Sequence, residues 1–225
     1  MDPESIEEIR LEIDAQILRM KEPLFTSKAA PDPDWYLNAC LHVNGGNWDI
    51  YAMGYKRAGD ILVQYVADAN WDQDFLVYPI AFLYRQYLEL RLKELIFVSS
   101  RLLDQDAEIP KTHNLVSLWR QARPNIEAVW PDSETKDQLN AVEDRLKELC
   151  DIDSGSYAFR YPEDGKGTTT LTGMVHINLK QLRDVIQGIS HILDGSSIGM
   201  GEYLNAKHEM MAEYRAEMSR EYGEY

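Results

Sequence analysis

The segment from about Phe75 to Leu103 constrains the fold of this chain more than any other. Its apolar residues recur at helical spacing and lie on nearly every side of the helix axis: Ile80, Leu83, Tyr84, Tyr87, Leu88, Leu92, Leu95 and Ile96. A helix that is apolar all round is one that several neighbouring elements bury. We therefore expect this helix at the centre of a helical bundle, with Pro79 as an alternative start.

Helical patterns occupy much of the remaining sequence. Ser5 and Glu8 form a capping box for a first helix at about 5–21, and an apolar stripe predicts another at about 47–69. Further helices are expected at about 33–42, from 112 or 113 to an interruption or kink at Pro124, at 133–150, at 179–193, and from 202 to the last residue after a glycine-containing break at 195–201.

Residues from about 151 to 173 have the composition of an ordered loop, rich in glycine and proline. Thr168 to Thr172 favour a short strand, so this loop has room for one short β-hairpin. The predicted fold class is therefore all-α: an irregular up-and-down helical bundle with a long ordered loop. We expect a helical extension at 1–74 packed on the core, a helical core at 75–195, and a charged helix or arm at 196–225.

The chain carries a formal net charge of −15, which opposes indiscriminate binding to nucleic acid, because Lys and Arg supply phosphate contacts. The charge is uneven: residues 85–123 carry +2, whereas 1–84 carry −8 and 124–225 carry −9. A polyanion would be repelled least at this centre. The N-terminus is too acidic for a signal peptide, and no apolar run reaches the roughly 20 residues that span a bilayer. We therefore expect a cytoplasmic protein that does not bind membranes.

The common metal, nucleophile and phosphate motifs are missing from the sequence. The five histidines include no HExxH and none lies four residues from another ligand, so we expect no zinc site. A Gly-Lys pair occurs at 165–166, but Arg160 occupies the position where a phosphate loop needs its first glycine. No GxSxG motif occurs either. We therefore expect neither a metal nor another cofactor.

Arg85 and Glu89 are four residues apart on the most apolar helix, so at least one of them is expected to point inward. An arginine inside a core needs a partner, and Glu89 is able to provide it. One interpretation is a buried or interfacial ion pair. The other is an arginine that Glu89 orients to bind an anion such as a phosphate.

His113 and Asn114 open a helix after a proline-containing loop. One interpretation is simple N-terminal capping, because Asn114 and Thr112 are both good capping residues. The alternative is an anion site at the helix N-terminus, with His113 as general acid or base, because the ordinary pKa of histidine lies near neutrality.

The run Ser154 to Asp164, with sequence SGSYAFRYPED, combines aromatic residues, Gly, Pro and one arginine. Aromatic residues in a loop anchor it to a bundle, and Arg160 is then held in a fixed place. Arg160 is either a simple exposed arginine on a packed loop or a functional residue, because ordered loops carry sites disproportionately. Tyr161 and Lys166 are further candidate binding residues beside it.

These elements, in order, resemble the HEPN superfamily of prokaryotic helical proteins. The matching text is Tyr78-Pro79-Ile80 leading into FLYRQYLELRLKELI, then THNLVSLW, then SGSYAFRYPEDGKG, within about residues 75–195, roughly half of the chain. Many HEPN proteins are dimeric, metal-independent endoribonucleases of antiviral defence or toxin–antitoxin systems. Their pattern places a histidine about four to six residues after an arginine on one helix, and neither Arg85 nor Arg160 is followed by one here.

The resemblance implies a protein that binds or cleaves RNA or nucleotides, as a homodimer, with Arg85, His113 and Arg160 as catalytic residues. His113 would supply the missing histidine from another helix. Glu89, Asn114, Tyr161 and Lys166 would then be binding residues. The alternative function is a catalytically inactive helical dimer or accessory subunit that binds and regulates a partner protein, with the acidic terminal helices as its binding surfaces.

Overall fold

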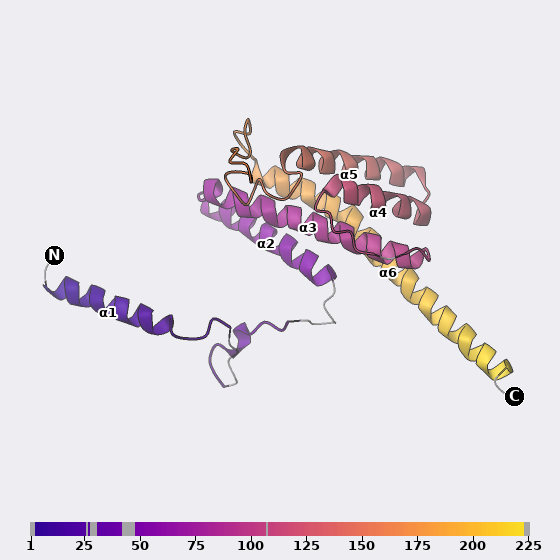
Figure 1. The fold of residues 1–225 in the computed structure, drawn as a ribbon, viewed down its shortest axis with the longest axis horizontal. Coiled ribbons are helices and arrows are strands. Elements are labelled where there is room, and N and C mark those ends of the chain that lie inside the picture. Colours follow the sequence, from indigo (N-terminus) through magenta and orange to yellow (C-terminus); the bar gives the residue numbers. More distant parts are fainter. Residues whose placement is uncertain (1–2, 26, 28–30, 42–47, 107, 223–225) are drawn as a thin grey trace. The chain divides into compact units, whose positions relative to one another are not determined.

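The computed structural model describes residues 3–25, 27, 31–41, 48–106 and 108–222 (Figure 1). The chain divides into two compact units, residues 1–46 and 47–225. Most described residues of the second unit are helical, and the described residues of the chain form no β-strand. The predicted all-α fold class is therefore confirmed.

The described residues of the first unit form helix α1 (Pro3–Arg19) and the 3-10 turn η1 (Trp35–Leu37). The predicted first helix is present, two residues earlier in the chain than expected. The predicted helix at 33–42 is reduced to the 3-10 turn, and the end of that range lies outside the described residues. The apolar stripe of α1, which is Ile6, Ile9, Ile13 and Ile17, is exposed.

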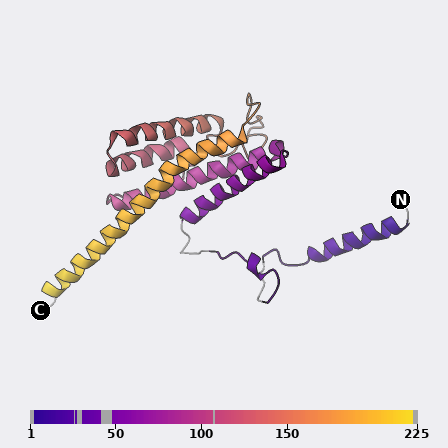
Figure 2. The ribbon, with the colours of Figure 1, turned by 180° about the vertical axis from the view of Figure 1, so that it is seen from behind.

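The described residues of the second unit form a bundle of five helices: α2 (Trp48–Ala69), α3 (Gln73–Leu102), α4 (Leu115–Val129), α5 (Ser133–Ile152) and α6 (Leu179–Tyr222). Helix α3 packs against α2, α4 and α6, as its apolar pattern predicts. Helix α5 lies on α4, and α6 runs across the bundle and continues beyond it (Figures 1 and 2). Residues from all five helices form one buried apolar core, in which Leu88, Leu92, Leu118 and Leu193 are fully enclosed.

The buried arginine Arg91 connects three helices of this bundle through ion pairs. Arg91 of α3 places Nη2 2.7 Å from Asp49 Oδ1 of α2 and Nε 2.7 Å from Asp194 Oδ1 of α6. Glu94 on the next turn of α3 also pairs with it. Tyr87 donates a hydrogen bond of 2.8 Å to the same Asp194 oxygen. The desolvation cost of one buried guanidinium is thus offset by several carboxylates.

The predicted break at 195–201 is wrong, because α6 is one continuous helix through all three of its glycines there. Glycine costs only about 1 kcal/mol relative to alanine in a helix, which packing can offset. Gly199 shows such packing: a Cβ there would lie 2.9 Å from Trp130 Cζ2. The predicted kink or interruption at Pro124 does not end α4 either, and α3 starts at Gln73, six residues before Pro79.

The segment 153–178 is an irregular connection between α5 and α6. The predicted strand at 168–172 is absent; one isolated antiparallel bridge joins Glu163 and Thr169 instead. Asp164 closes this turn, because its Oδ1 accepts hydrogen bonds from the backbone N–H groups of Lys166 and Thr168. No helix in the described part of the chain is long and apolar enough to cross a membrane.

Candidate functional site

Arg85 is fully buried on α3, with 0% of its surface exposed, and each of its guanidinium nitrogens has a partner. Nη1 donates to Glu89 Oε2 at 3.1 Å, and Nη2 donates to the backbone carbonyl of His113 at 2.7 Å. Nε lies 3.3 Å from both the carbonyl oxygen and Oδ2 of Asp153. Of the two interpretations of Arg85, this geometry agrees with the buried ion pair. It joins α3 to the start of α4 and to the loop after α5.

Glu89, almost fully buried, is the acceptor at the centre of this cluster. Its Oε1 accepts hydrogen bonds of 2.8 Å from Lys93 Nζ and from His113 Nδ1, while Oε2 accepts from Arg85. Burial raises the pKa of Glu89, but the hydrogen bonds and charges of Lys93 and His113 together lower it by more than burial raises it. The pKa of Glu89 therefore lies below its ordinary value. Glu89 is therefore ionised at neutral pH.

His113 combines a buried anchor with an exposed ring. Its side chain is 64% exposed although Nδ1 is bonded to Glu89. An ionised carboxylate only accepts hydrogen bonds, so Nδ1 carries the proton that it donates. In the neutral imidazole, Nε2 is then left with its lone pair. A carboxylate that fixes the tautomer and orientation of a solvent-accessible imidazole is the arrangement that general acid–base catalysis uses.

Asp153, also buried, organises the loop that carries Arg160. Its Oδ1 accepts backbone hydrogen bonds from Tyr157 at 2.7 Å and from Ala158 at 3.1 Å. Its Oδ2 accepts no hydrogen bond and is held only by the charge of Arg85. Arg85 thus positions both the backbone of His113 and the first turn of the Arg160 loop.

The Arg160 side chain is exposed and lies among three aromatic rings. Its guanidinium carbon is 5.1 Å from the centre of the Tyr157 ring, 5.4 Å from that of Tyr161 and 5.6 Å from that of Phe82. Its Nε also donates to the Ser156 carbonyl. Cation–π contacts of this kind fix the direction of a guanidinium and leave its charge unneutralised. Arg160 is therefore positioned by the loop yet remains able to bind an anion.

His113 and Arg160 approach the same face of α3. Phe82, Arg85 and Glu89 are spaced by three and four residues and so share one side of the helix. Phe82 contacts Arg160 and Glu89 contacts His113, and these two positions are seven residues apart, or about 10 Å along the axis. This site brings together three basic side chains, Arg85, Lys93 and Arg160, and the two carboxylates of Glu89 and Asp153.

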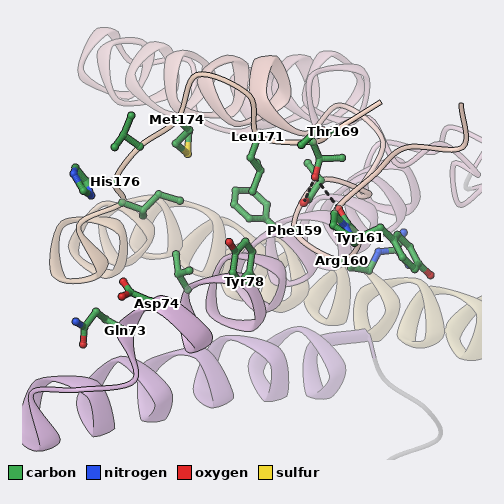
Figure 3. A pocket seen from close by; sticks show the side chains of 16 residues that line it. Gln73, Asp74, Tyr78, Phe159, Arg160, Tyr161, Thr169, Leu171, Met174 and His176 are labelled. Carbon is green, nitrogen blue, oxygen red and sulfur yellow. Dashed lines mark hydrogen bonds between the residues drawn. The ribbon is translucent and has the colours of Figure 1, made fainter. Parts of the chain in front are cut away.

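A cleft of about 1050 Å³ lies beside the Arg160 loop (Figure 3). Arg160 and Tyr161 lie at one end of it, and Gln73, Asp74 and His176 lie at the other, with Tyr78 and Phe159 between them. The first turns of α3 and the segment 158–177 form its walls. The Arg160 loop therefore borders both the His113 site and a ligand-sized cleft.

The remaining predicted site residues have more limited surroundings. Asn114 caps α4, because its Oδ1 accepts a 2.8 Å hydrogen bond from Ser117 N, which is the capping interpretation of this position. Tyr161 is half-exposed in the cleft. Lys166 is exposed at the tip of the Asp164 turn and outside the cleft. The assignment of these residues to ligand binding stays a prediction.

Three residues that position the site were not singled out in the sequence. Lys93 follows Glu89 by four residues, the same helical spacing that relates Arg85 to Glu89. The spacing therefore also predicts the contact between Lys93 and Glu89. Phe82 precedes Arg85 by three residues and was detectable in the same way. Asp153 is 68 residues from Arg85, and only the fold brings the two together.

The described residues contain no group of three or more His, Cys, Asp or Glu side chains that could hold a metal ion. No protein-family model, no curated protein and no solved structure matches this chain.

Proposed function

We propose that this chain binds single-stranded RNA and cleaves it as a metal-independent endoribonuclease. The observation that carries the proposal is the hydrogen bond between the exposed imidazole of His113 and the buried Glu89 carboxylate. Such a pair supplies a general base, and RNA brings its own nucleophile in the 2′-hydroxyl. An accessible arginine, Arg160, is available for the phosphate.

In the proposed reaction, His113 Nε2 removes the proton of the 2′-hydroxyl, and the 2′-oxygen attacks the adjacent phosphorus. The bond between phosphorus and the 5′-oxygen breaks, and this oxygen takes up a proton from solvent water. His113 then releases the proton it removed to solvent. The products are a 2′,3′-cyclic phosphate and a free 5′-hydroxyl. Arg160 stabilises the charge on the phosphate oxygens. Arg85 acts through others, because it holds His113 and the loop in place.

The resemblance to HEPN proteins supports the biological setting of this proposal. We place the activity in antiviral defence or a toxin–antitoxin system of a prokaryote or phage, and we expect a homodimer in the cytoplasm. The net charge of −15 opposes tight binding to any polyanion, so we expect RNA affinity to depend on a few contacts and to fall as salt is added.

The direct test is cleavage of a labelled single-stranded RNA in EDTA. The wild-type protein should release fragments that end in a 2′,3′-cyclic phosphate, and a 2′-deoxy substitution at the cut nucleotide should stop cleavage without stopping binding. Arg160→Ala should weaken binding and cleavage, whereas Arg215→Ala, on the exposed end of α6, should change neither. Cleavage of the 2′-deoxy position would refute the proposed chemistry.

A second candidate function is supported by the exposed apolar residues of the α6 extension. Met210, Met211 and Tyr214 are exposed on this helix beyond the core, and exposed apolar clusters commonly mark protein-binding surfaces. On this account the chain is an inactive accessory subunit that regulates a partner protein. It predicts that Tyr214→Asp abolishes the cellular effect of the protein, while Arg160→Ala and His113→Ala retain it.

A further inference from the structure

The cleft beside Arg160 has a chemical polarity from one end to the other. Arg160 supplies a positive charge at one end, and the Asp74 carboxylate supplies a negative one at the other. Between them lie the rings of Tyr78 and Phe159 and the apolar side chains of Leu171 and Met174 (Figure 3). A ligand that fills this cleft should therefore carry an anion, a flat apolar face and hydrogen-bond donors, in that order.

A nucleotide has these three parts in this order. The volume of about 1050 Å³ lies just above the roughly 300–1,000 Å³ range of small-ligand sites. Tyr78 and Tyr161, each 49% exposed, offer ring surface to a base. Base stacking on aromatic side chains is the usual way in which proteins hold unpaired nucleotides.

Asp74 distinguishes among the bases. It lies in the first turn of α3 with its side chain exposed, and no side chain or backbone group in the described part of the chain donates a hydrogen bond to its carboxylate. An ionised carboxylate has two acceptor oxygens and no donor. Among the RNA bases, only guanine presents two adjacent donors, N1–H and the N2 amino group, on its Watson–Crick edge.

We propose that this cleft is a subsite for an unpaired guanine nucleotide, with Asp74 on the guanine edge, Tyr78 against the base and Arg160 on the phosphate. This inference rests on the proposed RNA binding and adds a base preference to it. Because Arg160 borders both the cleft and the His113 site, the guanine would select which phosphodiester bond reaches His113.

The test is direct binding of 5′-mononucleotides to the full chain, measured by calorimetry at low salt. GMP should bind tighter than AMP, CMP and UMP. Inosine 5′-monophosphate, which differs from GMP only by lacking the N2 amino group, should bind about tenfold to a hundredfold more weakly, as expected for one lost charge-assisted hydrogen bond. Equal binding of GMP and inosine monophosphate would overturn the inference.

Two variants assign the preference to Asp74. Asp74→Asn should bind GMP and inosine monophosphate equally, because an amide presents only one acceptor oxygen, and Asp74→Glu should keep a preference for GMP. Since the Asp74 side chain is exposed, both variants should unfold at the wild-type temperature. A GMP preference that survives in Asp74→Asn would also overturn the inference.

Cleavage separates this inference from the proposed function. If the wild-type protein cuts RNA that lacks guanine as fast as RNA that contains it, the guanine subsite is refuted and the ribonuclease stands. If GMP binds with the predicted Asp74 dependence but no RNA is cut, the subsite stands and the ribonuclease is refuted.

Discussion

His113 Nδ1 lies 2.8 Å from Glu89 Oε1, and that carboxylate also forms ion pairs with Arg85 and Lys93. One buried side chain thus stabilises the fold and orients the candidate catalytic base. Changes to Glu89 should therefore affect stability and activity together, whereas loss of the exposed ring of His113 should reduce activity strongly and stability only by its one hydrogen bond to Glu89.

Glu89→Gln keeps the shape of the side chain but removes its charge, which leaves Arg85 and Lys93 without their shared anion. Breaking a buried ion pair by removing one partner costs about 3–5 kcal/mol, and we expect a loss toward the lower end because glutamine still accepts one hydrogen bond. Urea unfolding followed by circular dichroism measures this loss. The control is Glu148→Gln, an exposed glutamate that pairs with Arg145 on the surface of α5, and it should change stability by less than about 1 kcal/mol. Equal effects of the two substitutions would contradict the central role of Glu89.

Asp153→Ala removes the acceptor for the Tyr157 and Ala158 amides and one anion beside Arg85. We expect the Arg160 loop to open locally, so the amides of residues 157–160 should exchange hydrogen at least tenfold faster than in the wild type. Hydrogen exchange with mass spectrometry measures this change. Asp164→Ala is the matched control, because it should speed exchange at 166–168 and leave 157–160 unchanged. Unchanged exchange at 157–160 in Asp153→Ala would contradict the assigned role.

Gly59 allows α2 to pack closely on α3. A Cβ at Gly59 would lie 2.8 Å from Cε1 of the buried Tyr84 ring, whose hydroxyl donates to Asp60. Gly59→Ala should therefore destabilise the protein by about 1–3 kcal/mol in spite of its better helix propensity. Gly54→Ala on the same helix meets nothing within 4 Å, so it should stabilise by up to about 1 kcal/mol. Thermal unfolding of both variants tests the packing, and the same sign for both would contradict it.

Local patterns explain which features the sequence predicts. The apolar residues on all sides of α3 identify it as the central helix, because a helix that several neighbours bury shows this pattern within one continuous segment. Arg85 and Glu89 are detectable for the same reason, since helical spacing places them together. The continuity of α6 is not predictable from local patterns, because glycine propensity is local, whereas the ring of Trp130 that packs on Gly199 comes from the residue that follows α4.

The functional interpretation depends on contacts that no local pattern carries. The contact between Asp153 and Arg85 depends on the packing of α5 on α4, which places the end of α5 beside α3. The cleft brings Asp74 and Arg160 to one cavity from positions 86 residues apart in the chain. The sequence therefore indicates the residues of the Arg85 cluster better than it indicates the cleft beside it.

The ion pair between Glu143 of α5 and Arg123 of α4 should make the stability of the protein depend on pH. Hydrogen bonds from Lys147, then Arg123, lower the pKa of Glu143 from the ordinary 4.5 to about 2. Because the folded-state pKa lies below the unfolded one, this stabilisation is complete above about pH 4.5 and is lost as the pH falls toward 2. Glu143→Gln should lower stability at pH 7 by about 1 kcal/mol or less, because the group is partly exposed, and the difference from the wild type should shrink below pH 4.5. A difference that stays constant from pH 7 to pH 2.5 would contradict the assignment.

The most direct measurement of the central claim is the single-turnover rate of RNA cleavage by His113→Ala, with and without added imidazole. We predict a rate about 10²–10⁴ times lower than that of the wild type, partly restored by imidazole, while His208→Ala on the exposed part of α6 cuts at the wild-type rate. Circular dichroism should show the same fold in all three proteins, because the His113 ring is exposed. Cleavage by His113→Ala at the wild-type rate, or no cleavage of any RNA by the wild-type protein, would contradict the claim that His113 is a catalytic base.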